Sequence, residues 1–278
     1  MANFDFDQAE GLRRMLAGPK PRIVTFLSAT PQDDKGAMLV NLGASLARAG
    51  NDVLIVDATE ELDGVAARLG VDHSAGLLNV ARQECGINQV INQVPQGFGV
   101  VSLKQVRRPG PCGPDELRRL AKTFDVLVKQ SGIVIVDGAL GADDSFPIPI
   151  MANAEIVVQV GTSATSITAA YTLIKRLSLQ FGRRPFGILV TGASESEAKV
   201  VYDNMASAAS RYLAVQLSSM GSVPADEYLQ RAARLGRAVV DAFPLAGASV
   251  AFRRLAGRFA LAPAAQLRRP GERSTIGY

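Results

Sequence analysis

The sequence predicts an α/β fold, a doubly wound and mostly parallel sheet with helices on both faces. Apolar, β-rich runs alternate with helical patterns along most of the chain, which is typical of such a sheet. Two of these runs end in an acid, Asp57 and Asp137, and open α/β sheets bind ligands at the carboxyl ends of their strands. The chain has 278 residues, 47% of them hydrophobic and 20% charged, so it can bury the core of one large domain.

The first strand, loop and helix predict where a ligand binds. In order they are an apolar run at 22–28, a short polar loop, an amphipathic helix at 37–50 and a buried run at 52–57. This βαβ unit places its first loop at a helix N-terminus, where nucleotide phosphates commonly bind. We therefore expect the site at Lys35 and Gly36, close to Asp57 and Asp137.

The remaining elements continue the alternation of strand and helix. Short helices are expected within 59–69 and 77–85, strands at 99–103, 132–137, 155–160, 186–190 and 215–223, and helices at 115–130, 166–181, 195–212, 226–235 and 248–261. The helix at 166–181 is expected to begin with Thr165 or Ser166 as its N-cap.

We expect the chain to be divided into three parts. They are an N-terminal helical arm at 1–18, one α/β domain at 22–262 and a polar C-terminal tail at 263–278. In the arm, Leu12, Met15 and Leu16 share one helical stripe. About a dozen residues form only a marginal helix alone, so the arm either packs on the domain or engages a partner.

Composition excludes several kinds of function. Two cysteines, Cys85 and Cys112, are too few for a disulfide framework or a metal cluster and fit a reducing cytoplasm. The formal charge of +4 is too small and dispersed for a nucleic-acid groove. The one histidine, His73, is expected in a solvated loop, which leaves little material for Ser/His or Cys/His catalysis. Because charged residues or proline interrupt each apolar run, we expect a cytoplasmic protein without a spanning helix.

The loop before the first helix lacks most of what a phosphate cradle needs. Such a loop uses glycines, so that backbone N–H groups point inward, and a Lys followed by Ser or Thr for charge and magnesium. Here Gly36 takes the Ser/Thr position, and Pro31 offers no N–H. Asp33 and Asp34 would repel a triphosphate, at a cost of about 1 to 4 kcal/mol. We expect no tight nucleotide binding, and we expect Lys35 to be solvated.

Read with its flanking stretches, this loop resembles that of the MinD/ParA family of P-loop proteins, and most closely its FlhG/FleN branch of flagellar regulators. The family loop reads Lys-Gly-Gly-x-Gly-Lys-Ser/Thr, and residues 30–36 here read Thr-Pro-Gln-Asp-Asp-Lys-Gly. Better agreement is found at 53–58, 135–141 and 165–175. The resemblance covers nearly the whole chain. It implies a P-loop NTPase fold with a site for ATP and magnesium.

Four departures from the family pattern imply that hydrolysis has been abandoned. Besides the altered loop, the family's cross-dimer lysine falls on Thr30 and its water-activating acid on Thr59. Its adenine-recognising asparagine falls on 191–192, which are Thr and Gly. Asp137 matches the acid that holds magnesium through water, although a strand-end aspartate that caps a loop explains it equally well. The resemblance therefore implies no catalytic residue and a vestigial nucleotide site at Lys35, Gly36, Asp57 and Asp137.

The N-terminal arm resembles the motif by which FlhG-type proteins stimulate the GTPase FlhF. The residues that carry this resemblance are Asp7, Gln8, Ala9, Leu12 and Arg13. It implies that these residues bind an FlhF-type GTPase. A helix that packs on the protein's own sheet explains the same apolar stripe.

Three functions are consistent with the sequence. The first is a non-hydrolysing regulator of flagellar number and placement that acts through protein contacts; the second is a divergent ATPase that still binds ATP and magnesium. The third is a degenerate MinD-like protein of another polar assembly, such as pilus or cellulose machinery. A flagellar transcriptional activator or switch component is a further candidate partner. Because 262–271 interrupts any long amphipathic stripe, recruitment to the cell pole or inner membrane would depend on a partner.

Overall fold

The computed structural model describes residues 21–59, 64–72, 74–103, 113–141 and 143–261. The N-terminal arm, His73, Cys112 and the C-terminal tail lie outside these residues. The described chain forms one eight-stranded sheet in the order β3-β4-β2-β5-β1-β6-β7-β8. Neighbouring strands are parallel except for β3 and β4, so the predicted doubly wound α/β class is confirmed.

Strand bounds lie within a few residues of those predicted. The strands are β1 (Arg22–Ser28), β2 (Val53–Asp57), β3 (Asn92–Gln93), β4 (Gly99–Ser102), β5 (Ile133–Asp137), β6 (Glu155–Val160), β7 (Phe186–Thr191) and β8 (Leu217–Val223). In the β2–β5 pair, Asp57 lies opposite Asp137, and Phe26 of β1 lies opposite Asp137 on its other side. The register therefore places both predicted carboxylates side by side at the carboxyl edge of the sheet.

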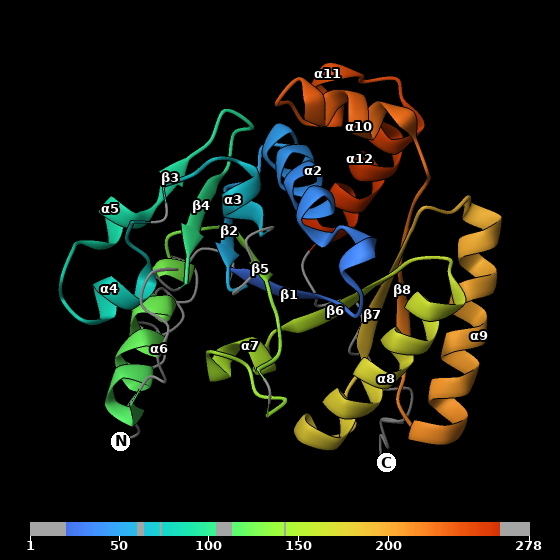
Figure 1. Ribbon diagram of the computed structural model, residues 1–278, viewed down its shortest axis with the longest axis horizontal. Coiled ribbons are helices and arrows are strands. Elements are labelled where there is room, and N and C mark those ends of the chain that lie inside the picture. The colour runs from blue at the N-terminus through green and yellow to red at the C-terminus, as the bar shows by residue number, and fades with distance from the viewer. Residues whose placement is uncertain (1–20, 60–63, 73, 104–112, 142, 262–278) are drawn as a thin grey trace, which may run out of the picture.

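Helices cover both faces of the sheet (Figure 1). They are η1 (Pro31–Asp33), α2 (Lys35–Arg48), α3 (Val65–Arg68), α4 (Leu77–Ala81), α5 (Ile87–Val90), α6 (Pro114–Val128), α7 (Pro149–Asn153), α8 (Ala164–Phe181), α9 (Glu195–Leu213), α10 (Glu227–Arg234), α11 (Val239–Ala242) and α12 (Gly247–Ala260). In the part of the chain described, no helix is both long and apolar enough to span a membrane.

Two hydrophobic clusters, one on each face, hold the layers together. One packs α2, α3, α10, α11 and α12 against the sheet, and the other packs α4, α6, α8 and α9. Alternation along β1 explains the division, because Val24 and Phe26 join the first cluster and Leu27 joins the second. Both faces are buried, which is why the central strands read as continuous apolar runs.

The structure differs from the prediction in two respects. The N-cap of α8 is Ser163, whose side chain accepts a hydrogen bond from the Ser166 N–H, so Thr165 and Ser166 lie inside the helix. Five short elements were not predicted, namely η1, β3, α5, α7 and α11. Each has two to five residues, too few to show a period in the sequence.

Candidate functional site

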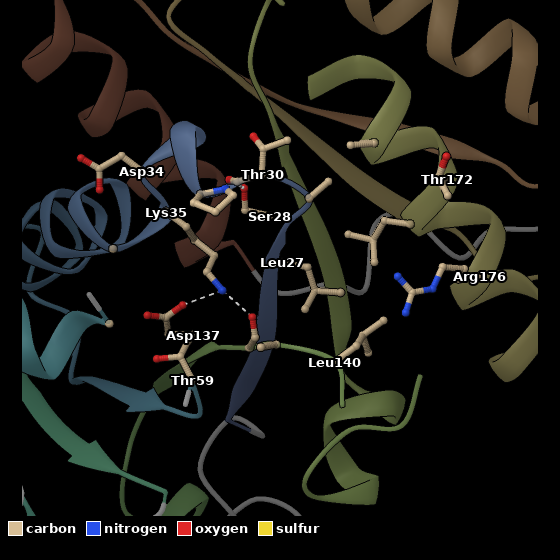
Figure 2. A pocket seen from close by; sticks show the side chains of 18 residues that line it. Leu27, Ser28, Thr30, Asp34, Lys35, Thr59, Asp137, Leu140, Thr172 and Arg176 are labelled. Carbon is tan, nitrogen blue, oxygen red and sulfur yellow. Dashed lines mark hydrogen bonds and ion pairs between the residues drawn. The ribbon is translucent and has the colours of Figure 1, made fainter. Parts of the chain in front are cut away.

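A cleft of about 450 Å³ opens at the carboxyl edge of the sheet, beside the first loop. Its walls come from the loop between β1 and α2, from residues 137–140 after β5, and from one side of α8. Figure 2 shows Lys35 and Asp137 on one side of this cleft, and Leu140, Thr172 and Arg176 on the other. The loop that was predicted to carry the site therefore does border a cavity.

The loop itself is a tight turn that uses its own backbone donors. The N–H of Asp33 donates to the carbonyl of Thr30 at 3.3 Å, and the N–H of Asp34 donates to the carbonyl of Pro31 at 3.1 Å. Asp34 adopts a left-handed conformation, with φ 47° and ψ 57°, between η1 and α2. A phosphate cradle needs such N–H groups to point at the ligand, whereas here the turn has already paired them.

The side chain of Asp34 takes the position of a helix cap. Its carboxylate accepts a hydrogen bond from the Ala37 N–H at 3.3 Å, in the first turn of α2. Arg68 of α3 forms an ion pair with the same carboxylate at 2.6 Å. An N-terminal helix cap satisfies a donor that would otherwise be free to bind an anion. The protein's own acid thus occupies the end of α2 where a phosphate would be expected.

Lys35 is engaged inside the protein, so the prediction that it is solvated is wrong. Its Nζ lies 2.8 Å from Oδ1 of Asp137 and also donates to the carbonyl of Gly138 (Figure 2). The side chain of Lys35 is 12% exposed and that of Asp137 is 1% exposed. A lysine can reach this position because the helix begins at residue 35 and the strand β5 ends directly opposite. The ammonium group of Lys35 therefore forms a buried ion pair with Asp137.

Asp57 and Asp137 together hold the start of α3. Asp57 accepts hydrogen bonds from the Ala66 N–H at 2.9 Å and from the Thr59 hydroxyl at 2.7 Å. Asp137 accepts one from the Val65 N–H at 3.3 Å. Burial and the neighbouring Asp57 carboxylate raise the pKa of Asp137, while the positive charge of Lys35 acts in the opposite direction. Both acids act as caps in this structure.

The contacts show how the predicted site residues are related. Lys35, Asp57 and Asp137 come together at one edge, and Gly36 is buried in the first turn of α2. The partner-binding residues predicted in the arm lie outside the described residues. Sequence reasoning missed Asp33 as a structural residue; it interacts with Ser166. Asp33 falls on the unrestricted position of the loop pattern, so the available signal was only a second carboxylate beside Asp34, which stands at a glycine position.

These residues do not fit an ATP–magnesium group. The N–H groups of Asp33 and Asp34 and the Lys35 amine are bound within the chain, and Thr59, in the family's acid position, donates to Asp57. The residues that line the cleft come from β1 and the first loop, from Thr59 and Gly64, from 137–140 and from α8, and they do not include 191–192, where the family's adenine contact would be. Polar groups at this edge of the cleft therefore form hydrogen bonds and ion pairs with one another.

Solved structures identify the class of fold. The MinD cell division protein of Aquifex aeolicus matches with a TM-score of 0.64 over 85% of this chain and 95% of its own, at 18% identity. A ParA family ATPase from Chlorobium tepidum gives 0.63 over 86% and 99%, also at 18% identity. The class is therefore a P-loop NTPase fold of the MinD/ParA type.

Sequence comparison resolves the branch. The antiactivator FleN of Pseudomonas aeruginosa is 31% identical over 219 residues, which are 78% of each chain. An uncharacterised ATP-binding protein of Methanocaldococcus jannaschii is 26% identical over 229 residues, 81% of this chain and 82% of that protein. No family model matches the sequence. The chain belongs to the MinD/ParA family, within its FlhG/FleN branch of regulators.

Proposed function

We propose that this chain is a cytoplasmic FlhG/FleN-like regulator of flagellar number or placement that acts through protein contacts and does not hydrolyse ATP. The observation that carries the proposal is the state of the first loop. The N–H groups of Asp33, Asp34 and Ala37 and the Lys35 amine are already paired with acceptors of the chain itself. To bind ATP, the protein would have to break a buried ion pair and a helix cap, and both changes cost free energy.

The proposed partner is an FlhF-type GTPase, engaged by the arm at 1–18. Gln8 and Arg13 carry donors that can approach a phosphate or a catalytic water, as glutamine and arginine do when they activate GTPases in trans. Leu12 supplies an apolar anchor that contributes about 1.5 to 3 kcal/mol when fully buried. The Pseudomonas relative is named an antiactivator, so a transcriptional activator is proposed as a second partner.

Two measurements on the full chain test this function. Calorimetry with Mg-ATP should show no micromolar binding, and the GTPase rate of the partner should rise when the chain is added. Deletion of 1–18 should abolish the stimulation and leave the melting temperature unchanged. Within the arm, Gln8→Ala should reduce stimulation, while Glu10→Ala, outside the motif, serves as the matched control. A melting temperature lowered by the deletion, with the GTPase rate unaffected, would show that the arm is structural.

A divergent ATPase is the second candidate function. The retained Lys35 at the start of α2 and the adjacent cleft of about 450 Å³ favour it. The same calorimetric titration, followed by an assay of phosphate release, separates the two, because micromolar affinity for Mg-ATP together with hydrolysis would establish the ATPase and reject the first proposal.

A further inference from the structure

Asp33 links the first loop to a distant part of the chain. Its carboxylate accepts hydrogen bonds from three hydroxyl groups: Ser28 at 3.3 Å, Thr30 at 2.5 Å and Ser166 at 2.9 Å. Ser28 ends β1 and Thr30 lies in the loop, whereas Ser166 lies in the first turn of α8. One carboxylate therefore fixes the shape of the loop and also joins it to helix α8.

The residues of β6 and α8 that form hydrogen bonds with Asp33 are buried and lie close to it. Ser166 is 2% exposed, and its hydroxyl also accepts the Gly161 N–H at 2.8 Å. Gln159, which is fully buried in β6, donates its amide to the backbone carbonyl of Asp33 and to the Thr191 hydroxyl. A Cβ atom at Gly161 would lie 2.6 Å from Oδ1 of Asp33, so the close approach requires glycine there.

We propose that Asp33 is a built-in substitute for a nucleotide, a latch that locks the loop onto α8 in one nucleotide-independent conformation. In a working phosphate loop, the anion and its contacts hold the backbone in shape. Here an internal carboxylate supplies the acceptors, and hydrogen bonds to a carboxylate are stronger than those between neutral groups. The proposal rests on the proposed function for its biological meaning. The regulator would keep the loop and α8 in the same relative position, and so present the same surface to a partner, without ATP.

The latch is tested on the full chain without nucleotide, by hydrogen exchange of the loop amides and of the first turn of α8. The variants are Asp33→Ala, Ser166→Ala and the double variant. Asp34→Ala is the matched control, because this neighbouring carboxylate pairs with Arg68 instead of α8. Asp33→Asn keeps the shape of the side chain and provides a second variant should Asp33→Ala fold poorly.

Asp33→Ala should speed exchange at least about tenfold in both segments, which corresponds to about 1.4 kcal/mol of opening free energy. The effects of Asp33→Ala and Ser166→Ala should add to less than their sum in the double variant, because both changes break the Asp33–Ser166 link and only Ser166→Ala also removes the acceptor of the Gly161 N–H. Asp34→Ala and Ser166→Ala should instead act additively. Exchange within about twofold of the wild type in Asp33→Ala or Asp33→Asn, or additive effects of Asp33→Ala and Ser166→Ala, would overturn the latch. The hydrogen-exchange experiment contains no nucleotide, so it can refute the latch without bearing on the proposed function. ATP binding by the wild type, measured separately, would refute the proposed function.

Discussion

Replacement of Lys35 should destabilise the fold. In a working P-loop the equivalent lysine binds the phosphates of the nucleotide instead. The informative variant is Lys35→Met, because methionine retains an apolar stem and removes only the ammonium group. The change leaves the carboxylate of Asp137, 1% exposed, without its 2.8 Å partner. Breaking a buried ion pair by removing one member typically costs about 3 to 5 kcal/mol.

The expected shift in melting temperature follows from the size of the chain. An unfolding entropy of about 2.1 cal/mol/K per residue amounts to about 0.6 kcal/mol/K over 278 residues. A loss of 3 to 5 kcal/mol then lowers the melting temperature by about 5 to 9 °C. Thermal unfolding monitored by circular dichroism, with urea unfolding as a second measure, resolves a change of this size.

The effect should also depend on pH in a defined direction. Burial and Asp57 raise the pKa of Asp137, and Lys35 opposes both, so removal of Lys35 raises that pKa further. A raised pKa means that the folded protein holds this proton more tightly than the unfolded chain does. Protonation therefore stabilises the fold at low pH, and this stabilisation is lost as pH rises through the folded pKa. The deficit of Lys35→Met should accordingly shrink as the pH is lowered from about 8 to about 5.

A double variant completes the test of the ion pair. Lys35→Met combined with Asp137→Asn replaces both charges, and the amide oxygen of the asparagine can still accept the Val65 N–H. This double variant should recover most of the lost melting temperature, although each single variant is destabilised. A loss below about 1 kcal/mol in Lys35→Met, or additive losses in the double variant, would refute a structural role for the pair.

Three further outcomes are expected. Mg-ATP should not change the mass measured by light scattering, because the N–H groups of Asp33 and Asp34 and the Lys35 amine are paired within the chain; a nucleotide-dependent dimer would contradict this. Gly64→Ala should lower the melting temperature, since its Cβ would lie 2.4 Å from a carboxylate oxygen of Asp57, whereas Gly257→Ala in α12 meets nothing within 4 Å and should be neutral or stabilising. Arg22→Ala should speed hydrogen exchange at the end of α12, because its guanidinium binds three carbonyls there at 2.8 to 2.9 Å; unchanged exchange would show that these bonds contribute nothing.

Sequence alone sufficed for the fold and for the meeting of Lys35, Asp57 and Asp137 at one edge of the sheet, because both depend on strong, repeated patterns. The β–α alternation predicts the sheet, and the strand-end acids Asp57 and Asp137 predict its functional edge. The two acids could be predicted to lie close together because parallel strands share one carboxyl edge. A short helix within 59–69 could be predicted, but the role of the two acids as its caps could not, since the Val65 N–H that Asp137 accepts is 72 positions away in the sequence.

The pairing of Lys35 shows why the finer chemistry was inaccessible. In the sequence, Lys35 is flanked by acids and glycine and reads as a solvated side chain, while its true partner lies 102 positions away at the end of β5. Local patterns report which side chains share a helix face or a strand face, but they carry no information on which acid a flexible lysine will reach. The same limit applies to Asp33 and Ser166, which are 133 positions apart.

In the altered loop, acidic side chains of the chain itself make the contacts that a bound nucleotide would make in a working P-loop. A P-loop that merely lost its glycines would leave unpaired donors at a helix N-terminus and a lysine without an acceptor, and both are costly near a buried edge. In this chain each loss is matched by an internal acceptor: Asp34 caps α2, Asp137 binds Lys35, and Asp33 accepts the loop hydroxyls. The two aspartates that weaken a nucleotide site therefore stabilise the loop without a nucleotide. Replacement of Asp33 and Asp34 by glycine would thus remove these stabilising contacts, and Pro31 would still deny the loop one of its N–H donors.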